Sequence, residues 1–207
     1  MAARRTSKLF GETLMRVIAG LAKGRNLISP IGATRPTSDR AREALFSSLE
    51  SEFGSLNDLA FLDLYCGSGA VGVEALSRGV AIVTGVDNDE KATNIARQNF
   101  QLIEKISGIG TYSVITMSCG KFLDRPADHP FDIIFLDPPY EIPNKEVEKN
   151  LSDLVSNSYV KKSTVIAIER DSKARPLEWP SKLREVKVRK YGAATIYYAE
   201  LASADSQ

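Results

Sequence analysis

The sequence predicts an α/β protein in which a mostly parallel sheet carries helices on both faces. From residue 60 to residue 169, short apolar runs alternate with stretches of helical periodicity. Repeated β-α units of this kind form parallel sheets with helices on both sides. Near the C-terminus, "LREVKVRKYGAATIYYAEL" has the alternation of two long strands around Gly192 and Ala193. This second pattern predicts an antiparallel β-hairpin that completes the sheet.

The chain has the composition of an ordinary globular protein, with 207 residues, 43% hydrophobic and 26% charged. Its length suits one domain with a modest appendage. It contains no apolar run of the roughly 18 residues that a membrane span needs, and its N-terminus lacks the apolar stretch of a signal peptide. The two cysteines, Cys66 and Cys119, provide neither a disulfide framework nor zinc-ligand spacing. We therefore expect a reducing, cytoplasmic setting, no bound metal and no membrane partner.

The N-terminal part of the chain is basic. Residues 1–42 hold nine Lys or Arg against two acids, a net charge of +7 that leaves −6 for the rest of the +1 chain. This asymmetry favours a polyanionic partner, although a solvated basic terminus would give the same count. Residues 1–14 are an expected flexible extension, and residues 15–36 an expected β-hairpin that turns at Lys23 and Gly24. A domain over residues 37–203 follows, beginning with a helix that Thr37 caps and that runs to about residue 52.

Within that domain the expected elements alternate regularly. Gly79 should end the first helix that follows a strand, and Asn88 should cap the next. The last helix should bury Val147, Leu151 and Leu154, which recur at helical spacing. The expected strands cover residues 60–65, 81–87, 112–116, 132–137 and 164–169, and the expected helices cover residues 69–79, 88–103, 119–124 (a short helix or turn) and a stretch from about 144.

A glycine-rich loop follows the first strand of this alternation. In "FLDLYCGSGAVG", Gly67, Gly69 and Gly72 match G-x-G-x-x-G, and Asp87 lies twenty residues after Gly67. This pattern is typical of dinucleotide sites, where the glycines admit a ligand and the acid binds ribose hydroxyls. A glycine turn that only permits a tight bend from strand to helix is the structural alternative.

Asp63, four residues before Gly67, distinguishes between two cofactors. A dinucleotide would place its pyrophosphate at the helix N-terminus, where a carboxylate would repel it. S-adenosylmethionine instead brings an ammonium group, which a carboxylate attracts. The spacing therefore favours S-adenosylmethionine over NAD. The expected cofactor contacts lie at the carboxyl ends of the strands, where such sheets bind ligands: Asp63, Tyr65, Gly67, Ser68, Gly69, Asp87, Asn88, Ser118, Cys119 and Asp137.

The buried run "FDIIFL" leads directly into the tetrad Asp137-Pro138-Pro139-Tyr140. The prolines fix the backbone and remove two N–H donors. The tetrad thus presents acceptors, namely the Asp137 carboxylate and the Pro138 carbonyl, which can take both hydrogens of a planar amine. This can direct the amine lone pair toward a methyl donor while Tyr140 stacks on the base. These four residues are the candidate catalytic residues, and the alternative is a rigid turn before a helix.

"FLDLYCGSG" and "LDPPY" resemble motifs I and IV of the amino-methyltransferases. Together with "MRVIAGLAKGRNL", "RPTSDRAREALF" and "RKYGAATIYYAEL", they closely resemble the bacterial 16S rRNA guanine-N2 methyltransferase family over roughly residues 15–201. The resemblance implies a Rossmann-like methyltransferase fold with a seven-stranded sheet, S-adenosyl-L-methionine as cofactor, and an N-terminal hairpin that touches 16S rRNA or the small ribosomal subunit. We expect a monomer whose RNA contacts are Arg16, Lys23, Arg25, Arg35 and Arg40.

Two other functions stay open at this point. The tetrad also serves enzymes that methylate adenine or cytosine amines in DNA, but the chain has no large insertion for a target-recognition domain. The second of these functions is that of a non-enzymatic RNA-binding module that keeps only the fold. The presence of the acids Asp63, Asp87 and Asp137 argues against it. The chain also departs from many methyltransferases in having Ser118 and Cys119 where an acid contacts the adenine amine, so a serine or main-chain contact is expected there.

Overall fold

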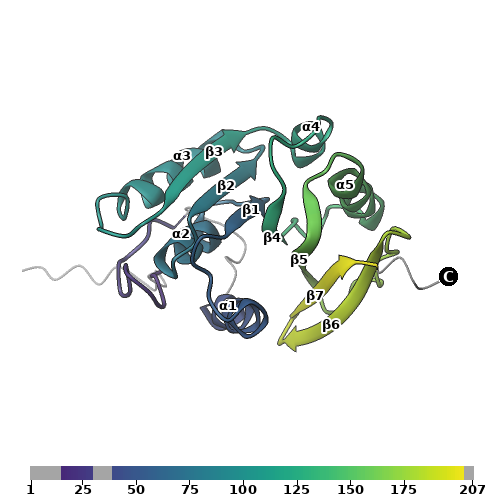
Figure 1. The fold of residues 1–207 in the computed structure, drawn as a ribbon, viewed down its shortest axis with the longest axis horizontal. Coiled ribbons are helices and arrows are strands. Elements are labelled where there is room, and N and C mark those ends of the chain that lie inside the picture. The colour runs from purple at the N-terminus through teal and green to yellow at the C-terminus, as the bar shows by residue number, and fades with distance from the viewer. Residues whose placement is uncertain (1–14, 30–38, 203–207) are drawn as a thin grey trace, which may run out of the picture.

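The computed structural model describes residues 15–29 and 39–202, which build one seven-stranded sheet in the order β3-β2-β1-β4-β5-β7-β6 (Figure 1). Strands β1 to β5 run parallel, and β7 lies antiparallel between β5 and β6. This confirms the predicted sheet and its C-terminal hairpin. The strands are β1 Ala60–Leu64, β2 Ile82–Asp87, β3 Thr111–Thr116, β4 Phe131–Leu136, β5 Val160–Asp171, β6 Leu183–Tyr191 and β7 Ala194–Leu201.

Helices cover both faces of the sheet, as the continuous apolar runs of its central strands require. On one face, Phe61 of β1 and Phe135 of β4 join an apolar cluster with α1, α2 and α3. On the other, Leu62 and Leu64 of β1 join a cluster with α4 and α5, which Figure 1 shows together beside β4 and β5. The helices are α1 Asp39–Phe53, α2 Ala70–Ser77, α3 Glu90–Gln101, α4 Cys119–Leu123 and α5 Asn144–Ser156.

The structure corrects two sequence predictions, one on the start of α3 and one on the described part of the N-terminal hairpin, residues 15–29. Asn88 does not cap α3, because the cap is Asp89, whose carboxylate accepts from the N–H groups of Lys91 and Ala92. Both residue types are good caps, so their adjacency left the position open by one residue. The predicted N-terminal hairpin takes a shorter form, with one antiparallel bridge between Arg16 and Asn26 in place of two strands.

Several expectations concern residues that the structure does not describe. The extension over residues 1–14, the RNA contact Arg35 and the helix cap Thr37 all lie outside the described ranges. Within those ranges, no helix is long and apolar enough to span a membrane.

Gly72 allows α2 to pack closely on the sheet. A Cβ at this position would stand 2.8 Å from Cζ of Phe100 and 2.9 Å from Cγ1 of Val83, closer than side-chain carbons approach. The first of these atoms belongs to α3 and the second to β2. The third glycine of the motif is therefore required by helix packing.

We expect Gly72→Ala to lower the free energy of unfolding by about 1–3 kcal/mol, because the added methyl overpacks a filled core. Gly120→Ala is the matched control, since Gly120 is also helical and its nearest neighbour, Oδ1 of Asn150, would lie 3.8 Å from the new Cβ. The control should be neutral or stabilising by up to about 1 kcal/mol. Urea unfolding of both variants checks this, and equal stabilities would contradict it.

Candidate active site

Parallel pairing brings the predicted acids to one edge of the sheet. Asp63 in β1 lies between Gly85 of β2 and Phe135 of β4. Asp87 ends β2, and Asp137 follows β4 directly, where its N–H donates to the carbonyl of Leu64 at 3.3 Å. Three carboxylates thus meet where sheets of this type bind their ligands.

Asp63 is the most buried of these acids, with 1% of its surface exposed. Its Oδ2 accepts from the N–H of Gly72 at 3.1 Å. Burial, together with the nearby carboxylates of Asp137 and Asp87, raises the pKa of Asp63 well above its usual value. A buried carboxylate in such surroundings is stabilised by a cation and repels an anion. This favours an ammonium group over a phosphate at the start of α2.

The glycine loop, residues 65–69, turns sharply between β1 and α2. Tyr65, Gly67 and Gly69 have φ values of 62°, 53° and 73°, in the left-handed region that glycine adopts without strain. A Cβ on Gly67 would meet no atom within 4 Å, so the backbone there faces open space. A ligand can therefore approach this part of the main chain.

Asp87 supports the glycine loop and keeps acceptor capacity for a ligand. Its Oδ2 accepts from the N–H of Gly67 at 2.8 Å, and its Oδ1 accepts from the N–H of Asp89 at 2.9 Å. Each carboxylate oxygen can accept a second hydrogen bond, and the residue is only half-buried. Two neighbouring hydroxyls, such as those of a ribose, are suitable donors. Asn88 lies exposed next to it.

The side chains of Tyr65, Ser118 and Cys119, called the neutral wall here, lie beside these acids near the start of α4. Ser118 caps this helix by accepting from the N–H of Lys121 at 3.4 Å. Cys119 is buried, which raises the pKa of its thiol to about 12 and keeps it protonated. Burial also raises the pKa of Tyr65, whose hydroxyl accepts from the Asn150 amide at 2.8 Å. Neither thiol nor phenol ionises near neutral pH, so this wall suits an uncharged ring.

The tetrad is held as a rigid turn. Pro138 is buried, whereas Tyr140 is 40% exposed. The Pro139 carbonyl accepts from the N–H of Ile142 at 2.9 Å. Arg170 of β5, itself buried, donates from one Nη2 to the Ile142 carbonyl at 2.9 Å and to Oδ1 of Asn144 at 3.0 Å. Sequence reasoning missed Arg170, although a basic residue after the apolar run "TVIAIE" is a signal of such an anchor.

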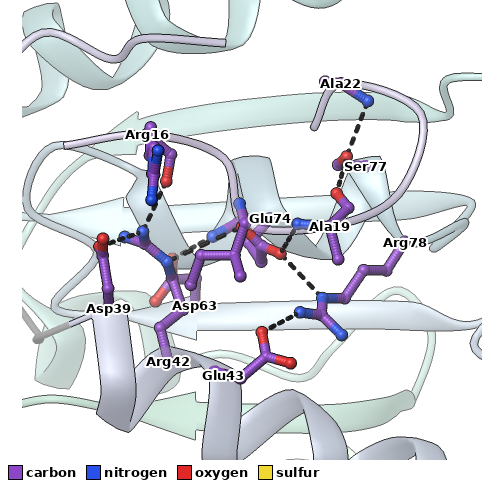
Figure 2. Close-up of polar contacts among 12 residues, drawn as sticks. Arg16, Ala19, Ala22, Asp39, Arg42, Glu43, Asp63, Glu74, Ser77 and Arg78 are labelled. Carbon is purple, nitrogen blue, oxygen red and sulfur yellow. Dashed lines mark hydrogen bonds and ion pairs between the residues drawn. The ribbon is translucent and has the colours of Figure 1, made fainter. Parts of the chain in front are cut away.

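Residues 15–29, called the docked segment here, lie on α2 (Figures 1 and 2). Glu74 of α2 accepts from the N–H groups of Ile18 and Ala19 at 2.8 and 3.0 Å, and from Nε of Arg78 at 2.8 Å. Ser77 accepts from the N–H of Ala22 at 2.9 Å and donates to the Ala19 carbonyl. The segment is therefore fixed to the helix that begins at the glycine loop.

The docked segment presents three of the predicted RNA contacts to solvent. Arg16, Lys23 and Arg25 are exposed, as is Arg40 at the start of α1. Lys23 and Arg25 line a groove of about 480 Å³ together with Leu21, Ala22, Gly24, Asn26 and Ile106. Arg42 does not add to this surface, because it is buried and its Nη2 contacts Asp39 and the Arg16 carbonyl at 2.8 and 2.7 Å.

Comparison with known proteins finds one matching family model and, among similar proteins, several methyltransferases. A family model described as "Conserved hypothetical protein 95" matches residues 15–200. Ribosomal RNA small subunit methyltransferase D of Haemophilus influenzae is 36% identical over 168 residues, 80% of this chain and 83% of the relative. A putative methyltransferase from Escherichia coli has a solved structure with a TM-score of 0.78 at 27% identity, covering 90% of this chain and 97% of that one. Magnesium protoporphyrin IX methyltransferase from Synechocystis, solved with bound S-adenosylmethionine, shares the fold at a TM-score of 0.60 and 17% identity, covering 79% of each chain.

The buried Glu74 generates a stability prediction. Glu74→Ala should lower the free energy of unfolding by about 3–5 kcal/mol, because it leaves Arg42 and Arg78 without their buried partner. Glu43→Ala is the control, since Glu43 also contacts Arg78 but is 49% exposed. Its loss should cost at most about 1 kcal/mol. Chemical denaturation measures the free energy of unfolding of both variants. Trypsin should also cleave the Glu74 variant faster at Lys23 and Arg25. Similar losses of stability in the two variants would contradict the role of Glu74 as a buried partner of the two arginines.

Proposed function

We propose that this chain, which belongs to the family described as conserved hypothetical protein 95, transfers a methyl group from S-adenosylmethionine to the exocyclic N2 of a guanine in small-subunit ribosomal RNA. The names of its relatives support an S-adenosylmethionine-dependent rRNA methyltransferase. The choice of guanine N2 is our own. The observation that carries it is the Asp137 tetrad, which lies beside a glycine loop flanked by Asp63 and Asp87.

The residues at the sheet edge fit S-adenosylmethionine. The half-buried Asp87 holds the ribose hydroxyls, and the buried Asp63 holds the ammonium group of the methionine end. The wall of Tyr65, Ser118 and Cys119 borders the uncharged adenine. The cofactor supplies a methyl group on a positively charged sulfur. The protein's contribution is to orient this methyl group toward the target amine, because positioning two reactants can remove much of a transfer barrier.

The tetrad prepares the target nitrogen. The lone pair of an exocyclic amine is delocalised into the base, which makes the nitrogen a weak nucleophile. The Asp137 carboxylate and the Pro138 carbonyl would accept hydrogen bonds from its two N–H groups and turn the lone pair out of the base plane. Once the nitrogen has gained the methyl group, it would release one of these two protons. Tyr140, partly exposed after the turn, stacks on the base once it has left its helical stack.

Guanine complements this carboxylate better than adenine does. Guanine presents N1–H and N2–H side by side, and a carboxylate offers two acceptors to such an edge. Adenine presents an acceptor beside its donor, a pattern that an asparagine amide matches instead. Because the Pro138 carbonyl can accept a hydrogen from any exocyclic amine, methylation of adenine N6 or cytosine N4 is the second candidate.

The exposed cations of the docked segment and α1 bind the RNA backbone. Arg16, Lys23, Arg25 and Arg40 contact phosphates, and such contacts position an RNA without reading its sequence. We retain Arg35 as a further proposed contact, although it lies outside the described residues. The substrate is the 16S rRNA or the small subunit that contains it.

A product analysis tests this function directly. The protein is incubated with labelled S-adenosylmethionine and, separately, with 16S rRNA, small ribosomal subunits or duplex DNA. The nucleic acid is then digested and the labelled nucleoside identified by mass spectrometry. N2-methylguanosine from RNA or subunits supports the proposal. N6-methyladenosine as the main product, or labelled DNA alone, would reject it.

We predict that Asp137→Asn lowers single-turnover transfer to guanine by roughly 10²–10⁴-fold, equivalent to about 2.7–5.4 kcal/mol, because an amide accepts through only one of its two heteroatoms. Cofactor affinity, measured by calorimetry, should fall far less than the transfer rate, because Asp137 is one of several expected cofactor contacts. Glu141→Gln is the control, since it makes the same chemical change on an exposed residue next to the tetrad. A near-normal rate in the Asp137 variant would exclude the carboxylate role.

A further inference from the structure

Asn99 of α3 connects two parts of the molecule that are far apart in sequence. Its side chain is fully buried. Oδ1 accepts from the N–H of Ile28 at 2.7 Å, and Nδ2 donates to the Ile28 carbonyl at 3.0 Å and to the Ser68 carbonyl at 2.9 Å. One planar amide therefore holds both the docked segment and the glycine loop.

The contact with Asn99 holds the later part of the glycine loop, as Asp87 holds Gly67. Ser68 is buried and lies between Gly67 and Gly69, which both have positive φ. Glycine permits many backbone conformations, so these neighbours do little to fix the Ser68 carbonyl. Helix α3 does fix it, through Asn99 and through Ala96, which lies against Gly69.

Besides the bond from Arg42 to the Arg16 carbonyl, two anchors hold the docked segment. Glu74 and Ser77 of α2 bind Ile18, Ala19 and Ala22. Asn99 binds the later residue Ile28 through both of its backbone groups. Of these two anchors, Asn99 is the one that also bonds to the glycine loop. Displacement of Ile28 would leave the buried Oδ1 without its donor, and displacement of Ser68 would leave one of the two N–H groups of Nδ2 without its acceptor. A buried hydrogen bond left unmade is unfavourable.

We propose that Asn99 is a positioning residue that couples cofactor binding to RNA binding, an inference that rests on the proposed function. Contact between the cofactor and the glycine loop fixes Ser68, and the Asn99 amide then holds Ile28 and the cations before it in one arrangement. The RNA meets a segment that is already ordered, so less conformational entropy is lost on binding. Linkage requires the converse, so RNA tightens cofactor binding by the same factor.

The test measures both affinities for the full chain. The probes are S-adenosylhomocysteine, which cannot transfer a methyl group, and a 16S rRNA transcript. In the wild type, saturating S-adenosylhomocysteine should lower the Kd for RNA by about 5–10-fold, within the usual range of coupling between sites. RNA should lower the Kd for S-adenosylhomocysteine by the same factor. A factor of one would overturn the proposal. A wild type that binds neither probe would instead defeat the proposed function, and the coupling with it.

Two variants separate coupling from simple docking. Asn99→Asp keeps an acceptor for the Ile28 N–H but loses both donor bonds, so its coupling factor should fall to about one. Ser77→Ala removes the side-chain bonds to Ala19 and Ala22 from the other anchor without touching Ser68. It should therefore weaken RNA binding equally with and without cofactor and keep the wild-type factor. An Asn99→Asp protein with wild-type coupling would overturn the proposal.

A wild-type measurement decides the question if the Asn99 variant does not fold. S-adenosylhomocysteine should slow hydrogen exchange of the Ile28 amide several-fold, because that N–H donates to Asn99. The Val17 amide, which donates to the Arg25 carbonyl, provides the internal comparison and should change less. Equal changes at the two amides, or none at Ile28, would overturn the proposal.

Discussion

The hydrogen bond from the Gly72 N–H to the buried Asp63 carboxylate fixes α2 against β1, and the rest of the site depends on where α2 lies. The glycine loop leads into this helix at its N-terminus. Glu74 and Ser77, further along it, bind the docked segment. The bond forms only because residue 72 is a glycine, since a Cβ there would collide with Phe100 and Val83. One helix therefore sets the positions of both proposed ligand contacts.

The three acids at the sheet edge differ in surroundings, and so in what they can do. Burial and the nearby carboxylates of Asp137 and Asp87 raise the pKa of Asp63, although it accepts from one backbone N–H, so a cation is its natural partner. Asp87 accepts two backbone N–H groups but remains half-buried, which leaves lone pairs for hydroxyl donors. Asp137 stands in a turn whose prolines offer no N–H, which suits it to receive donors from a base. In the proposed function, these three carboxylates bind three different kinds of donor.

The sequence predicts much of this arrangement because parallel strands place their carboxyl ends at one edge. The order of elements, the glycine loop and the positions of Asp63, Asp87 and Asp137 follow from that rule. Polar contacts between residues far apart in the sequence do not follow from that rule. Asn99 recurs at the helical spacing of apolar residues, yet this spacing does not reveal that its side chain binds Ile28. Glu74 lies within the largely apolar stretch "AVGVEALS", and nothing in that stretch reveals that it binds Ile18. The Asn88 cap was wrong by one residue because Asn and Asp cap helices equally well.

A double-mutant cycle on Asp63 tests the central claim, that its buried carboxylate binds the ammonium group of the cofactor. Calorimetry compares S-adenosylhomocysteine with 5′-methylthioadenosine, which lacks the amino-acid end, in the wild type and in Asp63→Asn. The amide can still accept from Gly72, so the substitution removes charge with little change in shape. The wild type should prefer S-adenosylhomocysteine, and the variant should lose about 1.5–3 kcal/mol of that preference. An unchanged preference would contradict the account.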